Sequence, residues 1–84
     1  MIVRIWEATV RPGRLDDALA WVRHDLIPRA LDADGCISAE MLKSEGDPLR
    51  VMLVTRWDAP PRFEEGVPSE DICERARAGH FETV

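Results

Sequence analysis

The chain has 84 residues, of which 45% are hydrophobic and 32% are charged, and these values are typical of one small globular domain. Its formal net charge is -5 and its eleven basic residues are scattered along the chain. Such a surface repels the phosphate backbone of nucleic acids, which argues against nucleic acid and anionic membranes as partners. Because a domain of this size buries only about 60–65% of the surface of its unfolded chain, we expect a homodimer that adds core.

No apolar run approaches the roughly 20 residues that a membrane-spanning helix needs, and Arg4 and Glu7 interrupt the first apolar stretch, unlike a signal peptide. Cys36 and Cys73 are too few for a disulfide framework, so we expect a cytoplasmic protein with free thiols. Neither cysteine forms a metal-binding motif with His80, and no metal or cofactor is expected.

Residues 2–10 are rich in β-branched residues and predict a first strand that ends at the turn-forming residues 11–13. Alternation places Arg4 and Trp6 on one face and Glu7 on the other, and neither face is cleanly polar. Both faces of this strand are therefore expected to be at least partly covered.

A helix is predicted from Leu15 to about Ala30, because apolar residues recur there at steps of three and four. Pro28 cannot donate a hydrogen bond to the carbonyl of His24, so we expect a kink or a loosened last turn. Trp21 and His24 lie three residues apart, beside the apolar stripe of this helix.

The second half of the chain predicts two antiparallel strands at 36–43 and 50–57, the latter apolar enough to be buried on both faces. A short helical turn is expected at 61–65. A second helix is expected at 69–78, because Ser69 is a plausible N-cap and Gly79 a plausible stop, and a last strand at 80–84.

This order, β-α-β-β-α-β, predicts a single α+β domain over residues 1–84 with the ferredoxin-like plan. The plan has a four-stranded antiparallel sheet with both helices on one face. A second sheet from a partner subunit would cover the other face most simply.

Four segments carry a resemblance to the antibiotic biosynthesis monooxygenase family of dimeric α/β barrels. They are Arg4-Ile5-Trp6-Glu7, Asp34-Gly35-Cys36 with Glu40-Met41-Leu42, Leu53-Val54-Thr55-Arg56-Trp57-Asp58 and His80-Phe81-Glu82-Thr83-Val84. The resemblance implies a homodimer with a ligand cavity between sheet and helices in each subunit. It also implies, for catalytic members, oxidation of electron-rich aromatic compounds by O₂ without metal or flavin.

The chain departs from the family in three ways that bear on function. A sister branch degrades heme with an Asn, a Trp and a His, but this chain contains no Asn, so heme degradation is not expected. It also has no Tyr to supply the phenol of quinol-oxidising members, and its segment from Trp57 to His80 is short for the family.

Trp6 and His80 are the candidate catalytic residues. The Trp6 indole would form a flat wall for an aromatic substrate, or else it fills the core. The His80 imidazole would accept a phenolic proton, or else it is a strand-end histidine bonded to a backbone carbonyl.

Four further residues are candidates for substrate binding. Trp21 and His24 would line a cavity mouth, or else they form a half-exposed surface pair. Arg4 and Arg56 would bind a substrate carboxylate or oxyanion, or else they form ion pairs with acidic residues of neighbouring strands or of the partner subunit. The candidate acidic partners are Glu7, Glu40 and Glu82, whereas Glu64 and Glu65 are expected on a solvated face.

The hypothesis that follows is a cytoplasmic, homodimeric, cofactor-independent monooxygenase that acts on a small aromatic, phenolic or quinol-like molecule. A non-catalytic dimeric module of the same fold, either a small-ligand binder or an accessory subunit, is the main alternative. A cofactor-free isomerase or cyclase, in which His80 moves protons without O₂, is a third.

Overall fold

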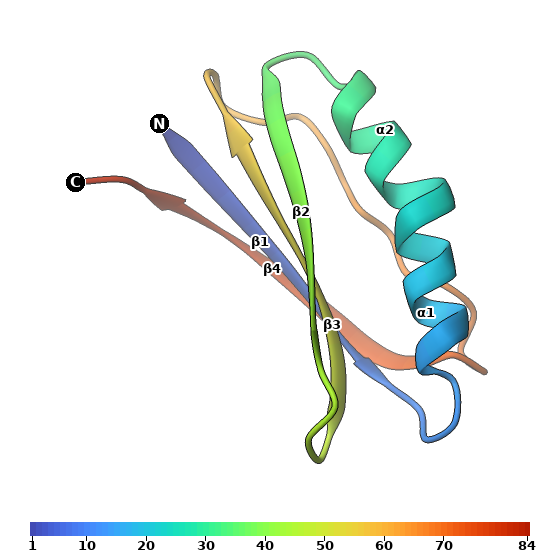
Figure 1. Cartoon of the computed structure of the whole chain (residues 1–84). Helices are drawn as coiled ribbons and strands as arrows, with labels where there is room; N and C mark the ends of the chain where they lie inside the picture. The colour runs from blue at the N-terminus through green and yellow to red at the C-terminus, as the bar shows by residue number, and fades with distance from the viewer.

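The computed structural model describes all 84 residues. The chain forms a four-stranded antiparallel sheet with one helical rod packed on a single face (Figure 1). The strand order is β2-β3-β1-β4, which confirms the expected α+β, ferredoxin-like sheet. The strands are β1 (Ile2–Val10), β2 (Cys36–Ser44), β3 (Leu49–Trp57) and β4 (Cys73–Glu82). The helical segments are α1 (Leu15–Trp21), the π-helical η1 (Val22–Leu26) and α2 (Ile27–Asp32).

The three helical segments form one continuous rod, and the irregularity expected from Pro28 lies in the turn that precedes it. In η1 the N–H of Ile27 donates to the carbonyl of Val22, a wider turn than that of an α-helix. This widening accommodates a residue that has no N–H and whose ring crowds the preceding turn. None of the helical segments is long and apolar enough to cross a lipid bilayer.

The core lies between the rod and the sheet, as the alternation of the strands requires. Its buried apolar residues are Trp6, Ala8, Val10, Ala18, Val22, Leu26, Ala30, Val51, Leu53 and Cys73. Trp57 is fully buried at the end of β3, where its ring centroid lies 5.9 Å from that of Phe63 in the following loop. Its indole Nε1 donates to Thr55 Oγ1 at 2.8 Å, so Trp57 anchors the end of the sheet as expected.

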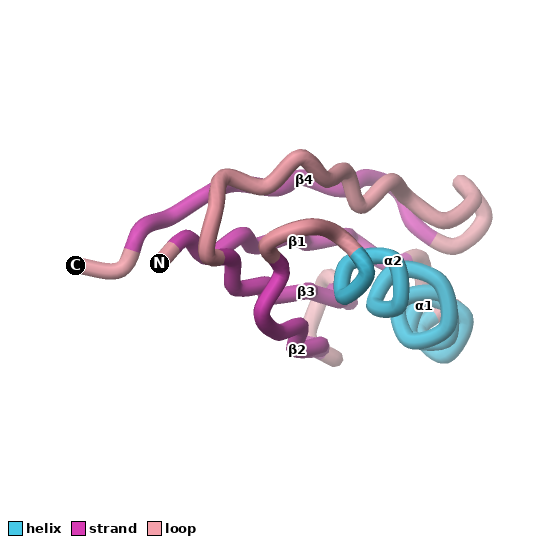
Figure 2. The backbone as a smooth tube through the Cα atoms, turned by 90° about the horizontal axis from the view of Figure 1, so that it is seen from above, coloured by secondary structure: helices cyan, strands magenta, loops and turns pink.

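The expected second helix at 69–78 is wrong, as is the short helical turn at 61–65. Residues 58–72 form an extended loop beside the rod, on the same side of the sheet (Figures 1 and 2). The last strand begins at Cys73 and pairs with β1 along almost its whole length. Without β4, β1 would be an edge strand with unpaired backbone groups, and this tertiary pairing overrides the local helical signals.

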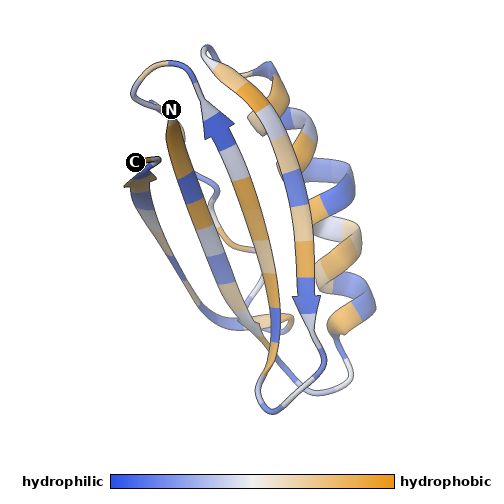
Figure 3. Cartoon of the chain, turned by 60° about the vertical axis from the view of Figure 1, so that its left-hand side comes forward, coloured by the Kyte–Doolittle hydropathy of each residue, from blue (hydrophilic) through white to orange (hydrophobic).

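The other face of the sheet is not covered by any element of the chain (Figure 2). Figure 3 shows bands of hydrophobic and hydrophilic residues along β1, and each face of this strand carries both kinds. Toward one end this open face is mainly apolar, formed by Val3, Ile5, Leu42, Met52, Val54 and Phe81, with the charged Glu40 and Arg56 among them. At the other end it is polar, formed by Glu7, Thr9, Arg50, Arg75 and Arg77.

The substitution Leu53→Ala tests the location of the core. Leu53 is 1% exposed, so its truncation removes buried contacts and leaves a cavity, and we expect the free energy of unfolding to fall by about 2–5 kcal/mol. The same truncation at Leu31, which is 51% exposed on α2, is expected to change it by less than about 0.5 kcal/mol. Urea denaturation measures both, and equal effects would contradict this placement of the core.

Candidate functional site

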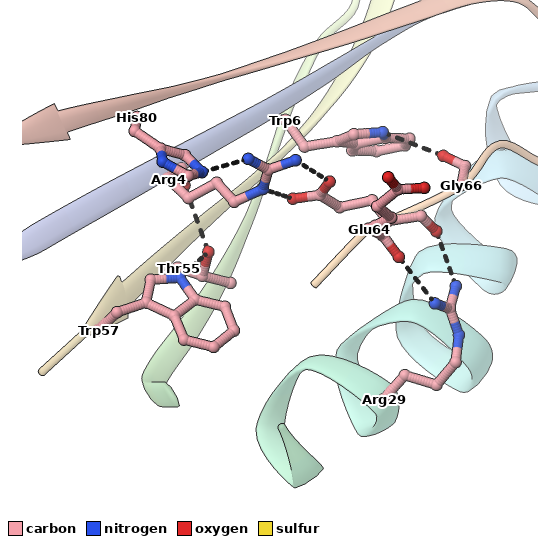
Figure 4. A network of polar contacts seen from close by, with 9 residues as sticks. Arg4, Trp6, Arg29, Thr55, Trp57, Glu64, Gly66 and His80 are labelled. Carbon is pink, nitrogen blue, oxygen red and sulfur yellow. Dashed lines mark hydrogen bonds and ion pairs between the residues drawn. The ribbon is translucent and has the colours of Figure 1, made fainter. Parts of the chain in front are cut away.

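Arg4, Trp6 and His80 come together on the side of the sheet that faces the rod (Figure 4). Arg4 lies opposite His80 and Trp6 lies opposite Ala78 in the register of β1 and β4. Since residues two apart in a strand point to the same face, these side chains share the face of the sheet on which the loop 58–72 lies. The small side chain of Ala78 leaves room for that loop to approach the sheet.

A bidentate ion pair joins Arg4 to Glu65 of the loop. Arg4 Nε lies 2.6 Å from Glu65 Oε2, and Arg4 Nη2 lies 2.8 Å from Oε1, which is the parallel geometry that a guanidinium and a carboxylate favour. Glu65 is only 3% exposed, and its hydrogen bond raises the pKa of Arg4 above the ordinary value. Arg4 was expected to pair with Glu7, Glu40 or Glu82, and this expectation is wrong because its partner in the chain is Glu65.

His80 receives the third contact of the Arg4 guanidinium. Arg4 Nη1 hydrogen-bonds to His80 Nε2, and since arginine has only donors, this ring nitrogen must be the acceptor. An imidazole that accepts a hydrogen bond at Nε2 carries its proton on Nδ1. This side chain contact replaces the backbone carbonyl contact that was the alternative for His80.

Trp6 is 3% exposed, and its ring is enclosed by neighbouring elements. Its indole Nε1 donates to the carbonyl of Gly66 at 3.2 Å. The ring centroid of Trp21 lies 5.8 Å away with the two planes tilted by 37°. Trp21 thus packs against Trp6 from the rod, and together with the loop it covers most of the Trp6 surface.

Arg29 of α2 holds the loop against the rod (Figure 4). Its guanidinium donates to the carbonyls of Glu64 at 3.3 Å and Glu65 at 2.8 Å. It also lies 5.9 Å from the ring centroid of Trp21 and 5.7 Å from that of Phe63, within the range of cation–π attraction. These contacts fix the backbone that presents the Glu65 carboxylate to Arg4.

An open depression of about 280 Å³ lies beside Arg4 and Trp6, bounded by loop residues 64–67 and by residues 76–78 of β4. This volume is slightly below the range of about 300–1,000 Å³ that is usual for small-molecule sites. His80 does not line it, but lies one step farther along the same face of β4.

Two of the sequence-predicted site residues are not part of this cluster. Arg56 lies between the buried Thr55 and Trp57 in β3, so its side chain is on the open face of the sheet, away from Arg4. His24 is exposed on η1 and makes no hydrogen bond or ion pair.

Glu65 is the site residue that sequence reasoning missed. Two adjacent glutamates before a glycine are typical of a solvated surface, and Glu64 is indeed exposed. The path of the loop 58–72 across β1 buries Glu65 and leaves Glu64 exposed. No periodicity within the loop encodes that path.

The two cysteines are poor nucleophiles in this structure. Burial raises the pKa of the Cys36 thiol and that of the Cys73 thiol, so both stay protonated at neutral pH. No group of three or more His, Cys, Asp or Glu side chains converges as a metal site would require.

The profile of one protein family, antibiotic biosynthesis monooxygenase, matches residues 1–70, which include the rod, three of the four strands and Glu65. The chain belongs to the antibiotic biosynthesis monooxygenase family. A search of curated proteins finds no match.

Two crystal structures assigned to the same family share the fold. One, from Bordetella bronchiseptica, is 24% identical with a TM-score of 0.78, and the match covers 99% of this chain and 96% of that chain. The other, from Bacillus cereus, is 15% identical with a TM-score of 0.67, and the match covers 96% and 89% respectively. The architecture of this family member is therefore established over nearly its full length.

The substitution Glu65→Gln tests the ion pair at the centre of the site. It leaves Arg4, whose side chain is 15% exposed, without its counter-charge, and we expect the free energy of unfolding at neutral pH to fall by about 1–3 kcal/mol. The neighbouring Glu64→Gln removes an exposed carboxylate and is expected to cost less than about 0.5 kcal/mol. Thermal and urea denaturation compare the two, and an equal loss would contradict a structural role for Glu65.

Proposed function

We propose that this protein is a cofactor-independent monooxygenase that oxidises a small aromatic molecule of the phenolic or quinol type. The observation that carries the proposal is the contact between Arg4 and His80, beside the Trp6 ring, in a member of the antibiotic biosynthesis monooxygenase family. A cytoplasmic location is part of the proposal, and the free thiols of Cys36 and Cys73 support it.

The chemistry begins with removal of a proton from the substrate. A phenolic hydroxyl that enters between Arg4 and His80 gives its proton to Nε2, the unprotonated nitrogen of the neutral imidazole. The oxyanion that remains faces the Arg4 guanidinium, which stabilises its negative charge. The proton acceptor and the anion-stabilising group are therefore already in contact before substrate arrives.

The resulting electron-rich anion is the reductant for O₂. For an anthrone-like substrate, one oxygen atom becomes the new carbonyl oxygen on the ring methylene carbon. The second oxygen atom leaves as water with the two methylene hydrogens, so the substrate supplies all the electrons. The protein then has to bind, orient and deprotonate the substrate, which are tasks for Trp6, Arg4 and His80.

Entry of substrate requires the loop 58–72 to move. The depression beside Trp6 is slightly small for a ligand site, and the Glu65 carboxylate occupies two of the Arg4 donors. The loop has no helix of its own, and its middle part is held by contacts of Arg4, Trp6 and Arg29. Arg11 and Arg14 hold the segment just before β4. An outward shift of Glu65 would free the Arg4 guanidinium for the substrate oxyanion.

The proposal includes a homodimer formed through the open face of the sheet. Apolar side chains gather there on all four strands, and Phe81 is 57% exposed and Leu42 43% exposed in the single chain. Soluble monomers rarely leave a large group of apolar side chains in water. A second copy of the same face would bury it and would add the core that an 84-residue domain lacks.

A non-catalytic module is the second candidate function, and the burial of Trp6 favours it. Its ring is covered by Trp21 and the loop, and every donor group of Arg4 already has a protein partner. In this case the cluster would stabilise the fold, and the protein would act by binding a small molecule or a larger complex. Measurement of O₂ consumption separates the two functions.

The substitution His80→Ala tests the catalytic hypothesis. We expect wild-type protein to consume O₂ with a panel of hydroquinones and anthrones, and His80→Ala to lower the rate about 10²- to 10⁴-fold because the proton acceptor is lost. His24→Ala removes the only other histidine, which is also exposed, and is expected to leave the rate unchanged. An oxygen electrode measures all three proteins, and equal rates for wild type and His80→Ala would remove His80 from the mechanism.

The substitution Phe81→Glu tests the dimer. A charge within the apolar half of the open face is expected to shift the protein from dimer to monomer at micromolar concentration, because burial of an unpaired carboxylate is costly. Val67→Glu is the matched control, since Val67 is also 57% exposed but lies on the loop, on the other side of the sheet. Sedimentation velocity measures both variants. A wild-type protein that is monomeric would refute the dimer.

A further inference from the structure

Three arginines converge on the open face of the sheet, at the end where β1 finishes and β4 begins. Thr9 of β1 lies opposite Arg50 of β3 on one side and opposite Arg75 of β4 on the other. Arg77 lies opposite Glu7, two residues earlier in β1. Together these side chains line a pocket of about 350 Å³ that the proposed oxygenase chemistry does not use.

The charges in this pocket are not balanced. Glu7 is its only acidic residue, and its carboxylate lies 3.7 Å from Arg50 Nη1 and 3.9 Å from Arg77 Nη2. Both distances are too long for hydrogen bonds, and Arg75 makes no ion pair. Three guanidinium groups against one carboxylate leave a local charge of +2 in a chain whose net charge is -5.

The hydrogen-bonding capacity of the arginines is also unused. Arg50 Nε is buried and is the one buried side-chain polar atom of the chain without a hydrogen-bond partner. Buried donors without partners are rare because they lose their hydration and gain nothing in return. The Arg50 side chain as a whole is 42% exposed, and the exposed guanidinium groups of Arg50, Arg75 and Arg77 also make no hydrogen bond, so they are the donors that a bound anion would contact.

We propose that this pocket binds a small, doubly charged oxyanion, such as a phosphate ester or a dicarboxylate. The planar guanidinium fork matches the paired oxygens of phosphate and carboxylate groups, and the charge of +2 matches a dianion. The Thr9 hydroxyl lies between Arg50 and Arg75, where it provides a further donor. The volume admits a small organic anion.

The location of the pocket keeps it apart from the other two surfaces. The sheet separates it from the Arg4, Trp6 and His80 cluster, because Glu7 and Thr9 point to the opposite face from Arg4 and Trp6. It lies at the polar end of the open face, beyond the apolar half assigned to the dimer. A bound anion would thus lie at the rim of that interface.

Titration with inorganic phosphate, glycerol phosphate and succinate tests the proposal, at neutral pH and at ionic strength held constant with sodium chloride. Isothermal titration calorimetry is expected to give saturable binding with a millimolar or lower Kd, and amide NMR shifts are expected to centre on Thr9, Arg50 and Arg75. Arg75→Ala is expected to weaken binding roughly tenfold or more, since a charge-assisted hydrogen bond is lost.

Two variants separate recognition by the arginine fork from a general effect of charge. Arg75→Lys keeps the charge but loses the fork, and it is expected to bind more weakly than wild type. Arg23→Ala removes the same charge from an exposed position on η1, in the rod, and is expected to bind as wild type does. A stronger response to the two phosphates than to succinate would identify the ligand as a phosphate, and the reverse would identify it as a dicarboxylate.

Several results would overturn the proposal. One is the absence of saturable binding by any probe at millimolar concentration. Another is an equal loss of anion affinity in Arg75→Ala and Arg23→Ala. A third is a weaker dimer in Arg75→Ala, measured by sedimentation, together with no anion binding by wild type. In that case a carboxylate of a second copy would occupy the pocket.

Discussion

The ion pair between Arg4 and Glu65 is the interaction on which the arrangement around β1 depends. It ties the loop 58–72 to the central part of the sheet, in the space where a ferredoxin-like fold would place its second helix. The same guanidinium also contacts Nε2 of His80. With Glu65 in place, Gly66 reaches the indole of Trp6 and completes its burial. The loop path, the burial of Trp6 and the position of His80 are therefore coupled through one arginine.

The alternation of β1 divides the protein into two surfaces with different chemistry. Arg4 and Trp6 face the rod and the loop, where acid–base chemistry on an aromatic molecule is proposed. Glu7 and Thr9 face the opposite way, together with the arginines of β3 and β4 and, toward the other end, an apolar patch. A one-residue change in strand register would exchange these sets, so the pairing of β1 with both neighbours maintains both surfaces.

The first 57 residues follow their local signals, and their strands and helix were predictable for that reason. The helix has an apolar stripe over four turns, and the apolar run of β3 marks it correctly as a strand. The expectation that β3 is buried on both faces is wrong, because Met52 and Val54 lie on the open face of the sheet. Residues 69–78 carried two competing signals. The capping residues Ser69 and Gly79 favoured a helix, whereas the alternation of Ala76 and Ala78 with Arg75 and Arg77 has the period of a strand. The hydrogen bonds available along the free edge of β1 decided in favour of the strand.

The sequence by itself determined the α+β class, the first three antiparallel strands, the irregular turn before Pro28 and the anchoring role of Trp57. Each of these depends on residues that are close together in the chain or on a simple period. Only the tertiary structure decided that Arg4 pairs with Glu65, 61 residues away, that Arg56 lies on the opposite face, and that three arginines share one pocket. Contacts of this kind depend on which strands are neighbours and on the path of a loop, because neither is encoded in any local pattern of residues.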